Sequence, residues 1–125
     1  MIGTLAQVAF GGAIGASVRW GLGRYITHIT GPGFPLGVLT CNVIGSLLMG
    51  LFIATAAHKE LTHLSPLIAT GLLGGFTTFS AFSMEAVHLM ERGDAGQAIA
   101  YIGLSVGTSL GALYAGLMIA RGLFA

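Results

Sequence analysis

Charged residues are scarce in this chain. Asp, Glu, Lys and Arg make up 7% of the 125 residues, hydrophobic residues make up 54%, and the mean hydropathy is +0.89. This composition is typical of a protein that spans a membrane. The formal net charge of +1 provides no basic stripe for nucleic acid, and the sequence has neither a GxxxxGK[ST] nor a GxGxxG motif. We therefore expect neither a nucleotide nor a nucleic acid as ligand.

Cysteine is almost lacking. The single residue, Cys41, excludes an internal disulfide and any metal site with several cysteines, so we interpret it as a packing residue. No Ser/His/Asp or paired-carboxylate arrangement indicates an enzyme. The four histidines lie near the expected helix ends without the spacing of metal ligands: His28, His58, His63 and His88.

Four long runs contain no charged residue: 1–18, 25–58, 61–84 and 95–120. A bilayer core about 30 Å thick takes about 20 helical residues, so these runs predict four membrane-spanning helices. We place them at about 4–26, 36–57, 65–90 and 95–122, within a single domain of residues 1–125. No basic segment and cleavage site precede the first run, so we expect the first helix to be retained.

Lys and Arg are balanced between the two sides of the predicted membrane domain. Four spans put the N-terminus, Lys59 and Arg121 on one side, and Arg24 and Arg92 on the other, with Arg19 close to Arg24. Orientation depends on this balance, and here it gives almost no preferred direction. Insertion in both orientations, followed by pairing into an antiparallel homodimer, is therefore our hypothesis.

Small residues recur four apart in two of the expected helices, a pattern typical of close helix packing in membranes. They are Gly11 and Gly15 in the first helix, and Gly103, Gly107, Gly111 and Ala115 in the last. A second stripe lies about 200° around the last helix and carries hydroxyl groups. It consists of Tyr101, Ser105 and Ser109. We expect the glycine face to pack and the other face to offer its hydroxyls.

The segment 71–85, GLLGGFTTFSAFSME, is unusual for a helix that only has to span. Glycine costs about 1 kcal/mol against alanine in a helix interior, and unpaired backbone at membrane depth is tolerated only where it lines a protected cavity. We interpret the segment as a helix broken near its middle around an ion. An unwound turn at residues 74–78 would free carbonyls for a cation, although a glycine-rich helix crossing has the same letters.

Several polar and aromatic side chains have both a structural and a functional interpretation. Asn42 can join two helices or donate its amide N–H groups to an anion. Phe79 and Phe82, three residues apart, can pack in lipid or core, or present their positive ring edges to a small anion. Glu85 is an acid inside a predicted span or near its interface. Arg19 can reach the headgroups or attract anions in a vestibule.

Three segments resemble the Fluc, or CrcB, family of bacterial fluoride channels: GGAIGASVRW (11–20), LGVLTCNVIGSLLMG (36–50) and GLLGGFTTFSAFSME (71–85). The resemblance covers essentially the whole chain, and GGFTTFSAFS is its most specific part. It implies a passive fluoride-selective channel in the lipid of the bacterial plasma (inner) membrane, which exports cytoplasmic fluoride and relieves its toxicity. It also implies an antiparallel, dual-topology homodimer with two pores and a central structural Na⁺.

The resemblance further implies a role for individual residues. Asn42 would be the pore amide, Phe79 and Phe82 the rings along the path, Tyr101, Ser105 and Ser109 the polar track, Glu85 the acid along the exit path, and Arg19 the vestibule arginine. The backbone carbonyls of Gly74 and Thr77 would hold Na⁺ on the dimer axis. Ala81 stands where the family usually has Thr or Ser, so one pore-lining donor is missing.

Two other classes of small membrane protein remain as alternatives. A dual-topology multidrug exporter needs an exchangeable acid deep in its first helix, and residues 4–26 contain none. A subunit that only packs against partners would explain the glycine stripes, but it leaves GGFTTFSAFS without a purpose. Fluoride holds its water tightly, so a pore needs several donors that are each weak enough to allow exit. Amide, hydroxyl and ring-edge donors fit that requirement.

Overall fold

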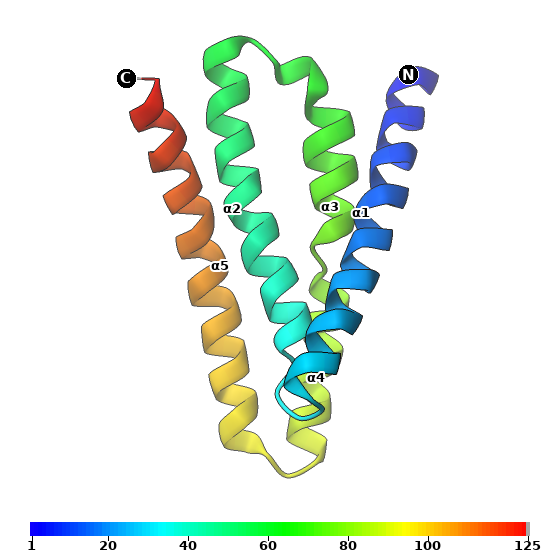
Figure 1. The fold of residues 1–125 in the computed structure, drawn as a ribbon, viewed down its shortest axis with the longest axis vertical. Coiled ribbons are helices and arrows are strands. Elements are labelled where there is room, and N and C mark those ends of the chain that lie inside the picture. The colour runs from blue at the N-terminus through cyan, green and yellow to red at the C-terminus, as the bar shows by residue number, and fades with distance from the viewer. Residues whose placement is uncertain (125) are drawn as a thin grey trace.

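The computed structural model describes residues 1–124, and within them every regular element is helical. The chain makes four helical passes (Figure 1). The first two are α1 (Ile2–Thr30) and α2 (Leu36–Lys59), and the last is α5 (Ala95–Leu123). The third pass consists of η1 (Thr62–Leu64), η2 (Pro66–Leu73), α3 (Gly74–Phe76) and α4 (Phe79–Glu91). The predicted all-α fold with four helical passes is confirmed.

The passes alternate in direction. Figure 1 places both termini and the turn between α2 and η1 at one end of the molecule, and the other two turns at the opposite end. Lys59 therefore lies at the end of the two termini, and Arg92 lies at the other end. This is the distribution of charged turns that the sequence predicts.

The helix ends differ from the predicted ends by a few residues, chiefly in α1. This helix begins two residues earlier than expected and continues to Thr30, where Gly31 takes a φ of 82° that ends it directly before Pro32. Glycine adopts a positive φ at little cost, so Gly31 can turn the chain out of the helix. The longer α1 brings its last turn, with His28, to the same end of the molecule as the start of α2.

Three helical segments are long and apolar enough to cross a membrane: Leu36–Lys59, Thr62–Glu91 and Ala95–Leu123. α1 has the same 29-residue length as α5, but it does not reach this hydropathy. Arg19 and Arg24 lie in its second half and lower its hydropathy. Hydropathy thus confirms three of the four predicted spans, and α1, the remaining one, is confirmed as a helix of matching length.

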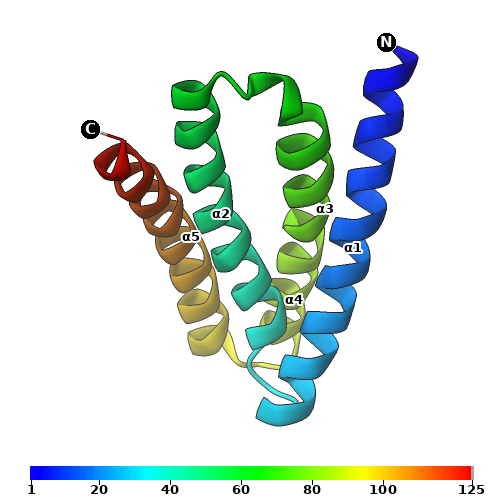
Figure 2. The same ribbon diagram turned by 45° about the horizontal axis from the view of Figure 1, so that its top comes forward.

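Glycines let α1 pack closely against the third pass. A Cβ atom on Gly11 would meet backbone atoms of Leu67 and Leu72, and one on Gly15 would meet backbone atoms of Leu72 and Phe76. Figure 2 shows α1 running beside the third pass. The predicted packing role of Gly11 and Gly15 is confirmed, and it leaves no room for a side chain between the two backbones.

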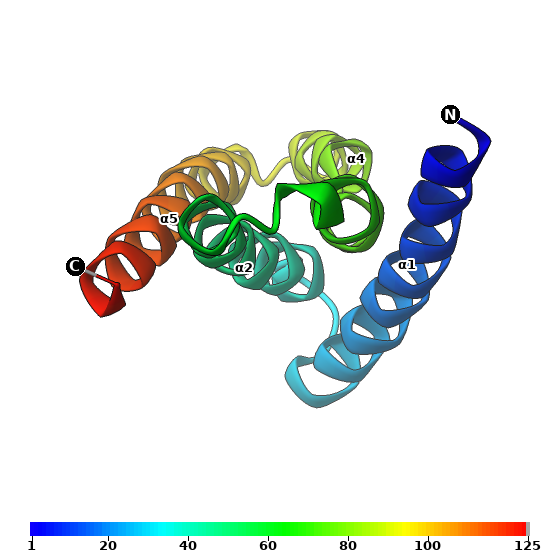
Figure 3. The same ribbon diagram turned by 90° about the horizontal axis from the view of Figure 1, so that it is seen from above.

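The packing of α5 differs from the prediction. α5 lies against α2 through Gly116, where a Cβ atom would meet backbone atoms of Leu47 and Leu51, and through Gly50, which meets the backbone of Leu113. A Cβ atom on Gly103, Gly107 or Gly111, the predicted packing stripe, would meet no heavy atom of residues 1–124 within 4 Å. The buried face of α5 is instead the face of Tyr101 and Ser105. Figure 3 shows α1 and α5 on opposite sides of the molecule, with α2 and the third pass between them.

Candidate functional site

The third pass is interrupted at two residues. Thr77 (φ −91°, ψ 157°) and Thr78 (φ −152°, ψ 123°) are extended, so the backbone leaves the helix after α3 and re-enters it at Phe79. The predicted break near the middle of this helix is confirmed. The extended residues are the two threonines, whereas Gly74 and Gly75 remain helical in α3.

The helix before the break is wider than an α-helix. Residues Pro66–Leu73 form a π-helix, and the N–H of Gly74 at its end donates to the carbonyl of Ala69, five residues back. π-helical turns occur frequently at functional sites. Gly71 within this segment lies in backbone contact with α1, at Val8 and Gly11. The wide turn and the glycine contacts therefore bring the backbone that leads into the break directly against α1.

Asn42 on α2 binds the backbone of the break. Its Nδ2 donates to the carbonyl of Thr78 at 3.1 Å, and its Oδ1 accepts from the Thr78 N–H at 2.8 Å. In an α-helix that N–H would donate to the carbonyl of Gly74. The Asn42 amide thus joins two helices, as one interpretation of the sequence expected. One hydrogen of its amide group is not used in this pair.

Thr78 also begins the next helix. Its Oγ1 accepts from the N–H of Ala81 at 3.1 Å, which makes it the N-cap of α4. From the sequence we expect Thr78 within the unwound turn at residues 74–78, but not as a helix cap. The sequence does contain a signal for this cap. Threonine is a common N-cap residue, and Thr78 lies immediately before the helical run that starts at Phe79.

Arg19 on α1 reaches the break from the opposite side. Its Nε donates to the carbonyl of Gly75 at 3.0 Å, across 56 residues of sequence. The side chain is partly buried. Arg19 therefore points toward the broken helix, and it also lines a large cavity. The snorkelling interpretation of Arg19 does not account for this bond.

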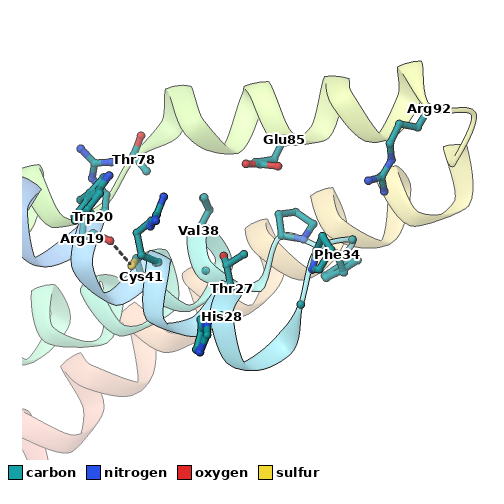
Figure 4. A pocket seen from close by; sticks show the side chains of 17 residues that line it. Arg19, Trp20, Thr27, His28, Phe34, Val38, Cys41, Thr78, Glu85 and Arg92 are labelled. Atoms are coloured by element: carbon teal, nitrogen blue, oxygen red, sulfur yellow. Dashed lines mark hydrogen bonds between the residues drawn. The ribbon is translucent and has the colours of Figure 1, made fainter.

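That cavity has a volume of about 620 Å³ and extends from the break to the end of the molecule that carries Phe34 and Arg92. Figure 4 shows Thr78, Glu85 and Arg92 following one another along the helix that forms one wall of this vestibule. The charged side chains that line it are Arg19, Arg24, Arg92 and Glu85. Arginines thus outnumber acids in the vestibule lining by three to one, and the lining favours an anion over a cation.

Two of these arginines have partners at the mouth of the vestibule. Arg92 Nη2 lies 3.3 Å from Oδ2 of Asp94, and the guanidinium of Arg24 lies 5.3 Å from the centre of the Trp20 ring. Both arginines are exposed, and contacts between exposed groups are weak, so they leave the positive charge of each arginine largely accessible to anions from solvent. Glu85 is half-buried on the vestibule wall.

A second cavity, of about 390 Å³, forms a groove on the other side of the break. Its lining comes from α2, the break, the start of α4 and the middle of α5. It includes Asn42, Gly45, Ser46, Met49, Thr77, Thr78, Phe79, Phe82, Ser105 and Ser109. Thr78 lines both cavities, so the vestibule and the groove both reach the break. Asn42, Gly45, Ser46 and Met49 share one face of α2 by their spacing, and all four line this groove.

Aromatic rings and two unpartnered hydroxyls lie beside the groove. The ring centres of Phe79 and Phe82 are 5.5 Å apart, and those of Phe82 and Tyr101 are 5.3 Å apart. Tyr101 is completely buried and Ser105 is 5% exposed, yet neither hydroxyl has a hydrogen-bond partner within residues 1–124. Buried polar groups of native proteins nearly always have a partner. Of the two residues, Ser105 also lines the groove, so its hydroxyl is the one that lies nearest to a ligand there.

The structure divides the predicted site residues among three places. Asn42, Phe79, Phe82, Ser105 and Ser109 line the groove. Arg19 and Glu85 line the vestibule, and Gly74 and Thr77 lie at the break. Tyr101 lines neither cavity, but its ring packs against that of Phe82, which lines the groove. Ala81, which lacks the expected hydroxyl, contributes its backbone N–H to the cap of α4.

Comparisons with known proteins show the family to which the chain belongs. The sequence profile of the family described as "CrcB-like protein, Camphor Resistance (CrcB)" matches residues 6–117. A relative from Ruegeria sp. (strain TM1040) is 60% identical over 124 residues, which is 98% of each chain. One from Cereibacter sphaeroides (strain ATCC 17029 / ATH 2.4.9) is 53% identical over the full length of both chains, and one from Jannaschia sp. (strain CCS1) is 66% identical over 82% of this chain and 98% of its own. Each of the three is named "Fluoride-specific ion channel FluC". A match of this length and identity means that the chain belongs to the CrcB family.

Proposed function

We propose that this chain is a fluoride-specific ion channel that carries fluoride passively down its electrochemical gradient. The observation that carries the proposal is that two cavities share Thr78 as a lining residue, where the third pass is broken inside an apolar protein. Its relatives of 50% identity and more over nearly the whole chain bear the name of such a channel. The function is transport, without a catalytic step.

The proposed path begins in the vestibule, whose arginines raise the local concentration of anions. It passes the break, where Asn42 has an unused amide hydrogen, and continues along the groove. There the ring edges of Phe79 and Phe82 and the hydroxyls of Ser105 and Ser109 replace the water that fluoride gives up. The Tyr101 ring packs against that of Phe82, and Glu85 lies on the vestibule wall, at the same end of the path as the arginines.

This set of donors suits conduction rather than tight binding. No arginine or lysine is among the residues that line the groove. Neutral donors hold an anion less strongly than a guanidinium does, so the ion can leave each position as well as enter it. Donors that can approach a small anion closely coordinate fluoride better than the larger chloride. We propose that rapid exit and discrimination against chloride both follow from this lining.

We propose that the carbonyls of Gly74 and Thr77 hold a structural Na⁺. The pairing of the Thr78 N–H with Asn42 releases the Gly74 carbonyl from the helix, and the Thr77 carbonyl lies in the extended segment. When bound there, Na⁺ would neutralise these carbonyl dipoles at membrane depth. Gly74 is exposed in the single chain, which fits a cation site that a second copy completes.

We propose that two copies pair in antiparallel orientation in the bacterial plasma membrane, as one channel unit built from the whole chain. The balanced Lys and Arg distribution supports this arrangement. The groove supports it too, because Phe79 (79% exposed) and Leu110 (67% exposed) on its border are uncovered in the single chain. A second copy that covered them would enclose the groove and bury apolar surface.

The function is tested by reconstituting the purified protein in liposomes and recording efflux with a fluoride electrode, in parallel with a chloride electrode. We expect rapid fluoride efflux and no chloride efflux, and strong reduction in N42A and F82I. F10I is the matched control, because Phe10 is 64% exposed on α1 and lines neither cavity. Absence of fluoride efflux from a folded wild-type protein would overturn the proposal.

The dual topology is tested separately with a single labelling site. In a Cys41→Ser background, a cysteine at Gly3 is suitable because a Cβ atom there meets no atom of residues 1–124 within 4 Å, so it should not disturb packing. A membrane-impermeant maleimide applied to sealed vesicles should reach about half of these cysteines from outside, and the rest only after lysis. Complete labelling, or none, before lysis would contradict dual topology while leaving the flux result intact.

A further inference from the structure

We propose that Arg19 is a positioning residue of the helix break: its guanidinium fixes the carbonyl of Gly75 and thereby sets the course of the backbone from α3 into Thr77 and Thr78. The bond from Arg19 Nε to the Gly75 oxygen, at 3.0 Å, is the observation that carries this inference. The flux part of the test rests on the proposed function. The structural part does not.

The register between α1 and the break is set by backbone contact. A Cβ atom on Gly75 would lie 2.8 Å from the carbonyl oxygen of Gly12 and 3.2 Å from the nitrogen of Ala16. Gly15 touches the backbone of Phe76, and Arg19 is one helical turn further on the same face. Because no side chain separates the two backbones, α1 cannot slide along the third pass. Arg19 therefore lies beside one particular carbonyl, that of Gly75.

That carbonyl needs a donor. In a continuous helix the Gly75 oxygen would accept from the N–H of Phe79, but the extended residues Thr77 and Thr78 remove that partner. Carbonyls at a helix C-terminus carry partial negative charge, and an arginine there stabilises the end. Arg19 thus replaces the lost backbone bond with a charge-assisted one on the α1 side, while Asn42 binds Thr78 on the α2 side.

The bond uses Nε, which is specific to arginine. Within residues 1–124 the two Nη groups of Arg19 are not used in this bond, and Arg19 also lines the vestibule. Lysine would keep the positive charge, but it lacks a planar guanidinium that donates sideways through Nε while presenting two further groups. A purely electrostatic role of Arg19 in the vestibule therefore predicts that lysine can replace it, and a positioning role predicts that lysine cannot.

Arg24 is the matched control within the same helix. It also lines the vestibule, but its guanidinium lies over the Trp20 ring, and it donates no side-chain hydrogen bond to the backbone of residues 1–124 that meets the usual geometric criteria. Replacing Arg24 changes the vestibule charge by the same amount as replacing Arg19. Comparing variants of the two arginines therefore distinguishes an effect of vestibule charge from an effect on the position of the Gly75 carbonyl.

The experiment compares R19K, R19Q, R24K and R24Q as purified full-length protein. Backbone hydrogen–deuterium exchange over residues 74–79 should be about tenfold faster in both Arg19 variants, because a hydrogen bond to a charged group is lost, and unchanged in both Arg24 variants. Fluoride efflux should fall in R19K as much as in R19Q. Wild-type exchange and efflux in R19K would overturn the positioning role.

A measurement on the wild-type protein avoids any folding defect of the variants. The Nε–H of arginine can be followed by ¹⁵N nuclear magnetic resonance, and a buried hydrogen bond slows its exchange with water. We expect the Arg19 Nε–H to exchange at least about tenfold more slowly than that of Arg24. Equal exchange would overturn the inference. Failure of the channel function would show instead as absent wild-type efflux, with both exchange measurements unaffected.

Discussion

The side chain of Asn42 forms a closed pair of hydrogen bonds with the backbone of Thr78, donating through Nδ2 at 3.1 Å and accepting through Oδ1 at 2.8 Å. A side-chain amide can replace a backbone neighbour in this way because it carries both a donor and an acceptor. The pair satisfies an extended residue at membrane depth, where unpaired backbone groups cost several kcal/mol. Asn42 therefore stabilises the break, and its remaining amide hydrogen lies beside the groove.

Replacing Asn42 with alanine should destabilise the protein as well as stop conduction. Both backbone groups of Thr78 lose their partners, and unpaired buried groups cost about 1–3 kcal/mol each. We expect N42A to unfold at a clearly lower temperature than wild type and to lose fluoride efflux. S46A is the control, since Ser46 lines the same groove one turn away and makes no such pair. Wild-type thermal stability in N42A would contradict the structural role of the amide.

Removing the buried hydroxyls should have the opposite effect on stability. Tyr101 and Ser105 are buried without hydrogen-bond partners in residues 1–124, so Y101F and S105A discard a group that costs free energy in the folded state. We expect thermal stability equal to or above that of wild type. Fluoride efflux should fall about tenfold or more, because a hydrogen bond to a charged group is worth about 1.5–3 kcal/mol.

The combination of higher stability and lower flux identifies a ligand-directed hydroxyl. T108A is the matched control: Thr108 is exposed on α5, and its hydroxyl donates to the carbonyl of Leu104 in its own helix. It should change neither property much. Undiminished fluoride efflux in both Y101F and S105A would remove these hydroxyls from the proposed path.

Gly15 should tolerate no side chain. A Cβ atom there would meet the carbonyl of Leu72, a backbone atom that cannot move aside as a flexible side chain can. We expect G15A to separate α1 from the third pass, to loosen the bond between Arg19 and Gly75, and to reduce the yield of folded protein. G21A is the control in the same helix, because Gly21 has no neighbour among residues 1–124 within 4 Å. Size-exclusion profiles and melting temperatures measure both variants, and normal behaviour of G15A would contradict the backbone contact.

The parts of the fold that the sequence predicts are those that depend on local chemistry. Runs without charge predict the four passes, and the GGFTT segment predicts the break, because glycine and threonine disfavour a continuous helix locally. Gly11 and Gly15 predict close packing since their spacing produces a smooth helix face. The helix-breaking chemistry of 74–78 extends over several residues, so it does not predict which two become extended; Thr78 is one of them and caps the helix that follows.

The remaining features depend on contacts between distant segments. Asn42 and Thr78 are 36 residues apart and Arg19 and Gly75 are 56 apart, and no local pattern states which backbone group an amide or guanidinium will reach. The glycine stripe of α5 shows the same limit: its spacing indicates a smooth face, but not which surface covers it. Within one chain the tyrosine and serine face is buried instead. Burial of a face is decided by the neighbouring helices.

Contacts near the C-terminus should contribute to the stability of the protein without affecting fluoride conduction. The ring of Phe124 stacks on that of His58 at 4.6 Å, with the rings 9° from parallel, and the ammonium of Lys59 lies 5.2 Å from the centre of the same ring. This cluster joins the ends of α2 and α5 at the end of the molecule opposite the vestibule. F124A should therefore lower the free energy of unfolding by about 1 kcal/mol and leave fluoride efflux unchanged. L123A is the neighbouring control, since Leu123 is 75% exposed. Loss of efflux in F124A at unchanged stability would mean that the joined ends of α2 and α5 control the groove between them.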